Sequence, residues 1–85
     1  MRRRSYAIWW TEGAGPRHAG KLELAPLHAL LSGNDGRLAL AFDDIVGVDY
    51  ARGELTVARR IGPSVRIGNL DAPGVLLELG DALAA

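Results

Sequence analysis

The stretch GNDGRLALAFDDIVGVDYARGELTVARR, residues 33–60, shows the organisation of the chain most clearly, because short apolar runs alternate in it with turn-forming residues. The first turn, at residues 34–36, consists of Asn, Asp and Gly, which accept positive φ. The run LALAF follows, and Phe42 shares one face of it with two leucines. A second turn at Arg52 and Gly53 separates two further strands. Strands joined by short turns predict an antiparallel meander.

The strand after Gly53 and its successor are expected to join through a loop of odd length, such as residues 62–64. An odd loop keeps the apolar residues of both strands on the inner face of the sheet, and it places Arg60 opposite Arg66 on the outer face. The residues expected on the inner face are Leu55, Val57, Arg59, Ile61, Val65 and Ile67.

The end of the chain changes its apolar period from two to 3.6. Asp71 is a good N-cap, and Pro73 fits the first turn of a helix. The apolar stripe that follows consists of Val75, Leu76, Leu79, Ala82 and Leu83. The pattern predicts an amphipathic C-terminal helix of about three turns, whose apolar face lies against the sheet or across the mouth of a barrel.

Toward the N-terminus, residues 21–33 can form either a helix or two strands, because both apolar periods fit them. Pro26 inside a helix would cost about 3 kcal/mol, so two strands are favoured. The second of these strands is expected to carry Leu27, Ala29 and Leu31 on one face.

The remaining strand, SYAIWWT at residues 5–11, contains both tryptophans of the chain. Neighbouring side chains of a strand point to opposite faces, so only one tryptophan can face a single core. Trp10 shares its face with Tyr6 and Ile8 and is predicted to be a core residue. Trp9 has small neighbours on its face, which leaves a flat apolar platform. The C-terminal helix, a loop or a binding partner is expected to cover it.

The predicted fold class is mainly β, a small antiparallel split barrel of about seven strands capped by one C-terminal α-helix. Eighty-five residues supply material for one core, so residues 1–85 are expected to form a single domain, with residues 1–4 as a disordered end. A domain of this size has a free energy of unfolding of about 4 to 13 kcal/mol. Extra burial by self-association would therefore matter.

Composition disfavours several classes of protein. The ten basic residues are balanced by ten acidic ones, which argues against a dedicated nucleic-acid binder. A membrane surface is not the expected partner either. The absence of cysteine excludes disulfides and thiolate chemistry, and fits a cytoplasmic location. No run approaches the ~18 apolar residues of a membrane span, and no signal peptide is expected. The preference for Arg over Lys, with many Ala and Gly, indicates a bacterial source.

Two segments resemble a known family. In LAFDDIVGVDYARGELTVARRIGPSVRIGNLDAPGVLLELGDAL, residues 40–83, an acidic pair precedes an Ile-to-Val strand, and a G-x-L-x-V strand, a short strand and a leucine-spaced helix follow. In AGKLELAPLHALLSG, residues 19–33, a G-x-L-x-L strand comes with its partner. These patterns resemble bacterial pleckstrin-homology-like (PH-like) and GRAM-like domains, over most of the chain.

The resemblance implies a split seven-stranded barrel closed by a C-terminal helix. Eukaryotic members of the family often hold phosphoinositide headgroups with a basic cluster between the first two strands. That loop here offers only Arg17, His18 and Lys21, with Glu12 and Glu23 beside them, which disfavours lipid binding. Bacterial members are associated more with protein contacts and self-assembly, so the resemblance implies an interaction module.

Few side chains are spaced for catalysis or metal binding. His18 and His28 are the two imidazoles, and no serine lies in a nucleophile motif. Asp43 and Asp44 lack the spacing of a calcium loop and are expected to be solvated acids at the entry to a strand. No catalytic residue, metal or cofactor is predicted, and the chain is not expected to be an enzyme.

Three functions follow from these patterns. The first is protein contact, most simply self-association, through Trp9, because tryptophan is common among hot-spot residues and a strand near a chain end can offer an unpaired edge. The alternative is binding of an anionic ligand or lipid headgroup by Arg59, Arg60 and Arg66, since facing like charges are destabilising without an anion between them. The third is a small-molecule or enzymatic role, which a roomy pocket with converging polar groups would favour.

Overall fold

The computed structural model describes residues 4–34, 36–70, 79–81 and 83. Its strands are β1 (Arg4–Glu12), β2 (His18–Leu24), β3 (His28–Gly33), β4 (Arg37–Ala41), β5 (Ile45–Ala51), β6 (Glu54–Arg59) and β7 (Val65–Asn69). A short 3-10 helix, η1 (Phe42–Asp44), connects β4 to β5. Residues 79–81 and 83 are helical.

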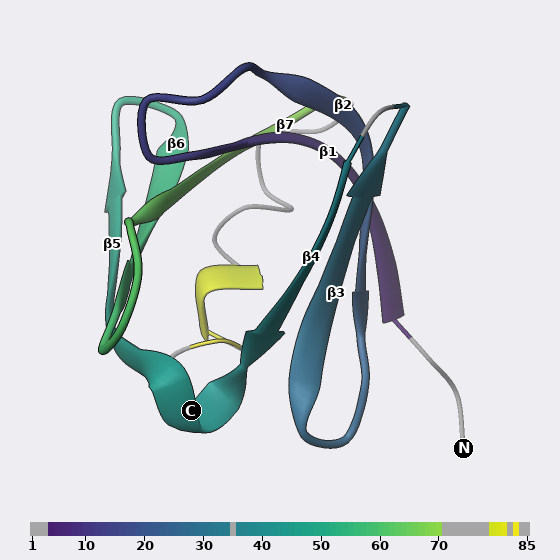
Figure 1. Cartoon of the computed structure of the whole chain (residues 1–85). Coiled ribbons are helices and arrows are strands. Elements are labelled where there is room, and N and C mark those ends of the chain that lie inside the picture. The colour runs from purple at the N-terminus through teal and green to yellow at the C-terminus, as the bar shows by residue number, and fades with distance from the viewer. Residues whose placement is uncertain (1–3, 35, 71–78, 82, 84–85) are drawn as a thin grey trace.

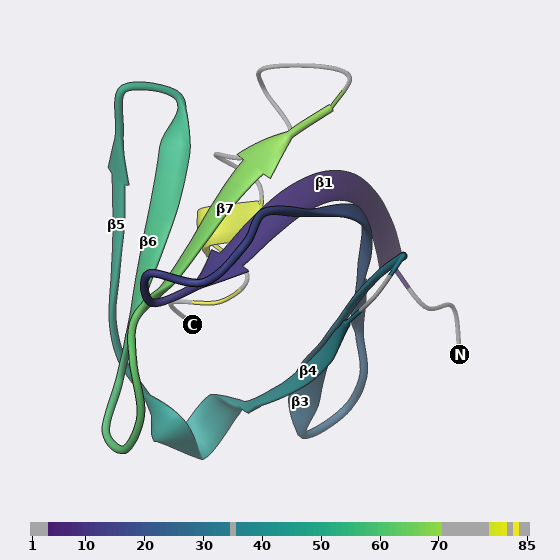
Figure 2. The same cartoon turned by 45° about the horizontal axis from the view of Figure 1, so that its top comes forward.

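The seven strands form one antiparallel sheet in the order β4-β3-β2-β1-β7-β6-β5. β1 is the central strand, while β4 and β5 are the edges and are joined by η1. The sheet curls into a half-barrel around the helical residues 79–81, as Figures 1 and 2 show from two sides. The prediction of a mainly β fold with seven antiparallel strands and one short C-terminal helix is confirmed.

The core occupies the inside of the curled sheet. Its buried apolar residues are Tyr6, Ile8, Trp10, Leu22, Ala29, Leu31, Leu40, Leu55, Val57, Val65, Ile67, Leu79 and Leu83. Alternation brings the core side chains of β1, β2, β3, β4, β6 and β7 to one face of the sheet, as the sequence predicted, and the helical residues add Leu79 and Leu83.

The C-terminal helical residues lie inside the half-barrel. Leu79 is fully buried and Leu83 nearly so, and both belong to the core. A Cβ atom placed on Gly80 would lie 3.1 Å from Leu55 Cδ2, so the helix backbone approaches β6 closely. The predicted docking of the helix on the sheet is confirmed for these residues. The predicted N-cap and first turn, Asp71 and Pro73, lie outside the described residues, as do Val75, Leu76 and Ala82.

The β6–β7 connection confirms the predicted odd loop but corrects its length. Val57 pairs with Val65, so the apolar faces are in register. The loop covers residues 60–64, and in it the backbone N–H groups of Arg60 and Ile61 donate to the carbonyl and to the carboxylate of Asp44. The predicted pairing of Arg60 with Arg66 is therefore wrong, and Arg66 lies opposite Thr56. Ile61, predicted to face inward, lies in this loop and is 77% exposed.

Two further predictions fail at strand ends. Leu27, expected on the inner face, is 76% exposed, because a tight turn closed by Ala25 N–H donating to the His28 carbonyl keeps it outside β3. Phe42, expected within a strand, begins η1 instead, and its N–H donates to the Leu27 carbonyl. Its half-buried side chain still packs against the core.

Candidate interaction surface

Trp9 lies on the outer face of the sheet, where β1 pairs with β2 and β7. Its cross-strand neighbours are small, Ala19 on one side and Gly68 on the other. The indole lies flat over Gly68, since a Cβ atom on that glycine would lie 2.1 Å from Trp9 Cε2. Only glycine fits there, and the indole covers the surface that the glycine leaves bare.

Arg17, in the loop between β1 and β2, covers the ring. Its Cζ lies 3.9 Å from the centroid of the Trp9 ring, in the geometry of a cation–π contact. The indole is thus held between Arg17 and the backbone of Gly68, and it is half-buried. Leu79 and Leu83 pack on the opposite face of the sheet, so a loop residue, and not these helical residues, lies over Trp9.

The side chains around Trp9 on the outer face of the sheet are mostly small. Ala7 and Ala19 are exposed. Arg66 lies diagonally across from Trp9, with its Nη1 3.8 Å from Glu54 Oε1. Small residues and one ion pair therefore surround the indole.

Thr11, two residues further along β1, is only 3% exposed, and its hydroxyl has no hydrogen-bond partner within the described part of the chain.

The prediction that the first strand can offer an unpaired edge is wrong. β1 is hydrogen-bonded to β2 along one side and to β7 along the other. Among the strands that the structure describes, the edges of the sheet are β4 and β5. Any contact through Trp9 must therefore use the face of the sheet and not strand pairing.

Trp10 is a core residue, as predicted, and is 2% exposed. Its indole N–H donates to the Ser32 carbonyl at 3.1 Å, and its ring lies 4.4 Å from that of His18. The Ser32 carbonyl occupies the space where a side chain of residue 20 would lie, which requires Gly20. His18 thus contributes packing to this end of the sheet.

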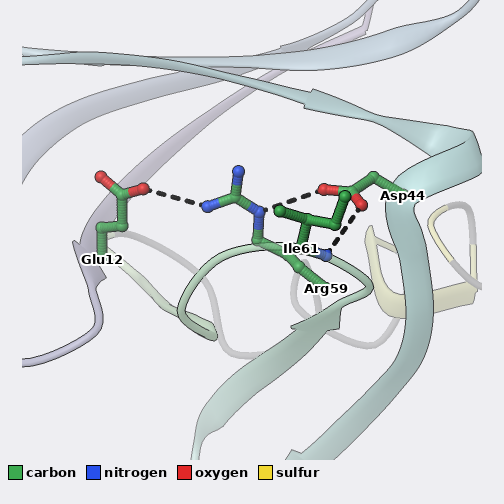
Figure 3. A network of polar contacts seen from close by, with 4 residues as sticks. All are labelled: Glu12, Asp44, Arg59 and Ile61. Carbon is green, nitrogen blue, oxygen red and sulfur yellow. Dashed lines mark hydrogen bonds and ion pairs between the residues drawn. The ribbon is translucent and has the colours of Figure 1, made fainter.

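The three arginines of the predicted anion site have different surroundings. Arg59 is only 14% exposed and lies between two carboxylates (Figure 3). Its Nη1 donates to Glu12 Oε2 at 3.0 Å, and its Nε donates to Asp44 Oδ2 at 3.4 Å. The second oxygen of Asp44 accepts the N–H of Ile61 at 3.2 Å. We call Glu12, Asp44 and Arg59 the clasp.

The clasp removes Arg59 from any positive patch, because two carboxylates already neutralise it. Arg66 is also paired, with Glu54. Arg60 is exposed in the β6–β7 loop. The structure therefore does not bring Arg59, Arg60 and Arg66 together as one anion site, because the loop that begins at Arg60 leaves the ladder on which their facing was predicted.

Within the ranges that the structure describes, no three His, Asp or Glu side chains gather as a metal site. Asp44 belongs to the clasp and is not simply solvated, whereas Asp43 is exposed. No helix among the described residues is long and apolar enough to cross a membrane.

Comparisons with known proteins give information on the fold only. No protein-family model matches the chain, and no curated protein matches it. Among solved structures, the chain is similar to the C-terminal domain of an unknown protein from Leishmania infantum, with a TM-score of 0.77 and 14% sequence identity. The match covers 96% of this chain and 83% of that one. The half-barrel architecture thus occurs in a chain of very different sequence.

Sequence reasoning identified Trp9 but missed the residues that hold it. Gly68 is separated from Trp9 by most of the chain, and nothing local to either residue indicates that they pair. The sequence indicates Arg17 only as part of the loop that binds lipid in PH-like domains, and gives no sign that it covers the indole. For the clasp, alternation predicted the inward direction of Arg59, but no pattern pointed to Glu12 and Asp44.

Proposed function

We propose that the protein is a non-catalytic interaction module that self-associates through the outer face of β1, β2 and β7 around Trp9. The observation that carries the proposal is the indole itself, half-buried on the outer face of the sheet among small side chains. Tryptophan and arginine are both enriched among residues that dominate binding energy, and here they are stacked on each other.

The rigidity of the Trp9–Arg17 pair supports this function. Gly68 fixes one face of the indole and Arg17 lies over the other, so the ring loses little rotamer freedom when a partner binds. Ala7 and Ala19 leave room for a partner backbone to approach the edge of the ring.

The charges of the face suit a second copy of the chain. Lys21 lies 3.6 Å from Glu23, and Arg66 lies 3.8 Å from Glu54, so the outer face carries both signs. In a two-fold arrangement the same patch meets itself, and each cation can then face a carboxylate of the other copy. The zero net charge of the chain adds no long-range repulsion.

The sheet topology supports the family resemblance as part of the same proposal. A sheet of seven antiparallel strands with a helix inside its curl agrees with the split seven-stranded barrel that the resemblance implies. Membership of that family, a bacterial source and a cytoplasmic location stay predictions.

Sedimentation equilibrium from micromolar to millimolar concentration tests self-association. We expect a dimer that Ala19→Arg converts to monomer, because a large charged side chain then stands beside the indole. Ala41→Arg, at an exposed position of β4, serves as the matched control and should leave the dimer intact. Unchanged circular dichroism would show that both variants fold.

Two results would overturn the proposal. A strict monomer at millimolar concentration would exclude self-association. A dimer that survives Ala19→Arg and Trp9→Ala would show that the contact lies elsewhere on the molecule.

A further inference from the structure

A hollow of about 440 Å³ lies on the outer face of β2, β3 and β4, beside the face around Trp9. Small-molecule sites in proteins usually have volumes of about 300 to 1,000 Å³. The side chains that line it include Lys21, Glu23, Leu30, Ser32, Arg37 and Ala39. The hollow therefore combines apolar and charged groups within the size range of a ligand site.

Strand register arranges these side chains in two neighbouring rows. Lys21, Ser32 and Arg37 form one row across the three strands. Adjacent strands lie about 4.8 Å apart, so the backbones of the two cations stand about 10 Å apart with a hydroxyl between them. The second row consists of Glu23, Leu30 and Ala39.

The charges of the side chains that line the hollow sum to one positive unit. Lys21 and Arg37 contribute two positive charges and Glu23 one negative charge, and the Lys21–Glu23 distance is 3.6 Å. Within the described residues, Arg37 forms no ion pair. A ligand with a single negative charge would neutralise the site, whereas a doubly charged phosphate would leave an excess beside Glu23.

The apolar residues of the second row can contact the apolar part of a ligand. Leu30 is half-buried and Ala39 is small and exposed, so an alkyl group can lie on them beside the charged row. The planar guanidinium of Arg37 fits a carboxylate with two parallel hydrogen bonds. The Ser32 hydroxyl, in the same row, is a further donor.

We propose that this hollow binds a small monocarboxylate with an apolar chain, its carboxylate held by Arg37, Ser32 and Lys21 and its chain lying on Leu30. This site is distinct from the predicted Arg59, Arg60 and Arg66 cluster. The hollow shares Lys21 and Glu23 of β2 with the face proposed for self-association, but its other side chains lie on β3 and β4, outside that face.

Titration of the ¹⁵N-labelled protein with octanoate, followed by two-dimensional NMR, tests the site. We expect saturable shifts of the amides of Lys21, Ser32, Arg37 and Ala39. Acetate lacks the chain and octylammonium carries the opposite charge, so neither should reproduce these shifts.

Two variants test separately the positive charge of Arg37 and the open volume of the hollow. Arg37→Gln should weaken octanoate binding about tenfold or more, since it removes the charge-assisted hydrogen bonds. Ala39→Phe should abolish binding by filling the hollow. Arg60→Gln is the matched control, because that arginine is also exposed but lies in the β6–β7 loop, outside the site. Arg37 and Ala39 are both exposed, so the folded spectrum should be retained.

Several results would overturn the site. These are the absence of saturable shifts, equal shifts with acetate or octylammonium, shifts centred on core residues or on Trp9, and unchanged binding by Arg37→Gln. Each would show that the hollow does not recognise an amphiphilic monoanion.

Discussion

Trp9 and Gly68 depend on each other across the β1–β7 pair. The glycine leaves the backbone bare, and the indole lies so close that a methyl group at residue 68 would overlap Trp9 Cε2. Aromatic side chains commonly cover glycine in this way, because the ring regains apolar contact that the glycine cannot supply. The surplus tryptophan of the sequence therefore has a structural partner in its own chain, besides any role in association.

Gly68→Ala should destabilise the protein by about 1 to 3 kcal/mol, because the new methyl group must displace the indole. In a Trp9→Ala background the same change should cost much less or stabilise β7, since alanine suits a strand better than glycine. Urea denaturation of the two single variants and the double variant gives the coupling energy. An equal cost of Gly68→Ala in both backgrounds would contradict the packing of Trp9 on Gly68.

The clasp joins the ends of two strands and the short helix η1. Glu12 lies at the end of β1, Asp44 in η1, and Arg59 at the end of β6 (Figure 3). The clasp therefore links the connection between the two edge strands to the centre of the sheet. Because Arg59 is only 14% exposed, its charge depends on these carboxylates for compensation.

Arg59→Gln should lower the free energy of unfolding by about 1 to 3 kcal/mol, since both carboxylates lose charge-assisted hydrogen bonds. Arg60→Gln is the matched control and should change stability by less than about 0.5 kcal/mol, because its side chain is exposed. Urea denaturation measures both. Equal effects of the two substitutions would show that the clasp contributes nothing beyond an ordinary surface charge.

The C-terminal helical residues are part of the core and not an appendage. Leu79→Asp places an unpaired charge among Leu55 and the other core residues, and should cost several kcal/mol. That is of the order of the whole free energy of unfolding of a domain this size. Thermal unfolding followed by circular dichroism measures the loss, with the exposed Asp81→Asn as control. An unaltered melting curve would contradict the docking of the helix.

The sequence predicted those features that depend only on alternation within one strand or on the length of one loop. Tyr6, Ile8 and Trp10 were assigned to the core because the period of two is visible within one strand. The register of Val57 with Val65 followed from loop parity. Such inferences need only neighbouring segments, and they hold for most of the seven strands.

Contacts between distant segments could not be predicted in this way. The pairing of β1 with β7 joins two strands that lie near opposite ends of the sequence. It makes β1 the central strand, although its place near the N-terminus suggested an edge strand. The carboxylates that hold Arg59 come from residues 47 and 15 positions away. The hollow on β2, β3 and β4 depends on how three strands align their outer side chains, which no single strand reveals.

The sheet order also predicts how protection against hydrogen exchange is distributed over the molecule. β1 has hydrogen-bonded neighbours on both sides, whereas β4 and β5 each have one. One core connects all these strands with Leu79, so global unfolding should be a single transition, while the edges should open locally at lower free energy. Amide exchange followed by NMR should therefore be slowest for β1 and its partners β2 and β7, and fastest among strand amides for β4 and β5. Equal protection of the edges and the centre would mean that the edge strands are covered in solution, as a second copy pairing through β4 or β5 would cause.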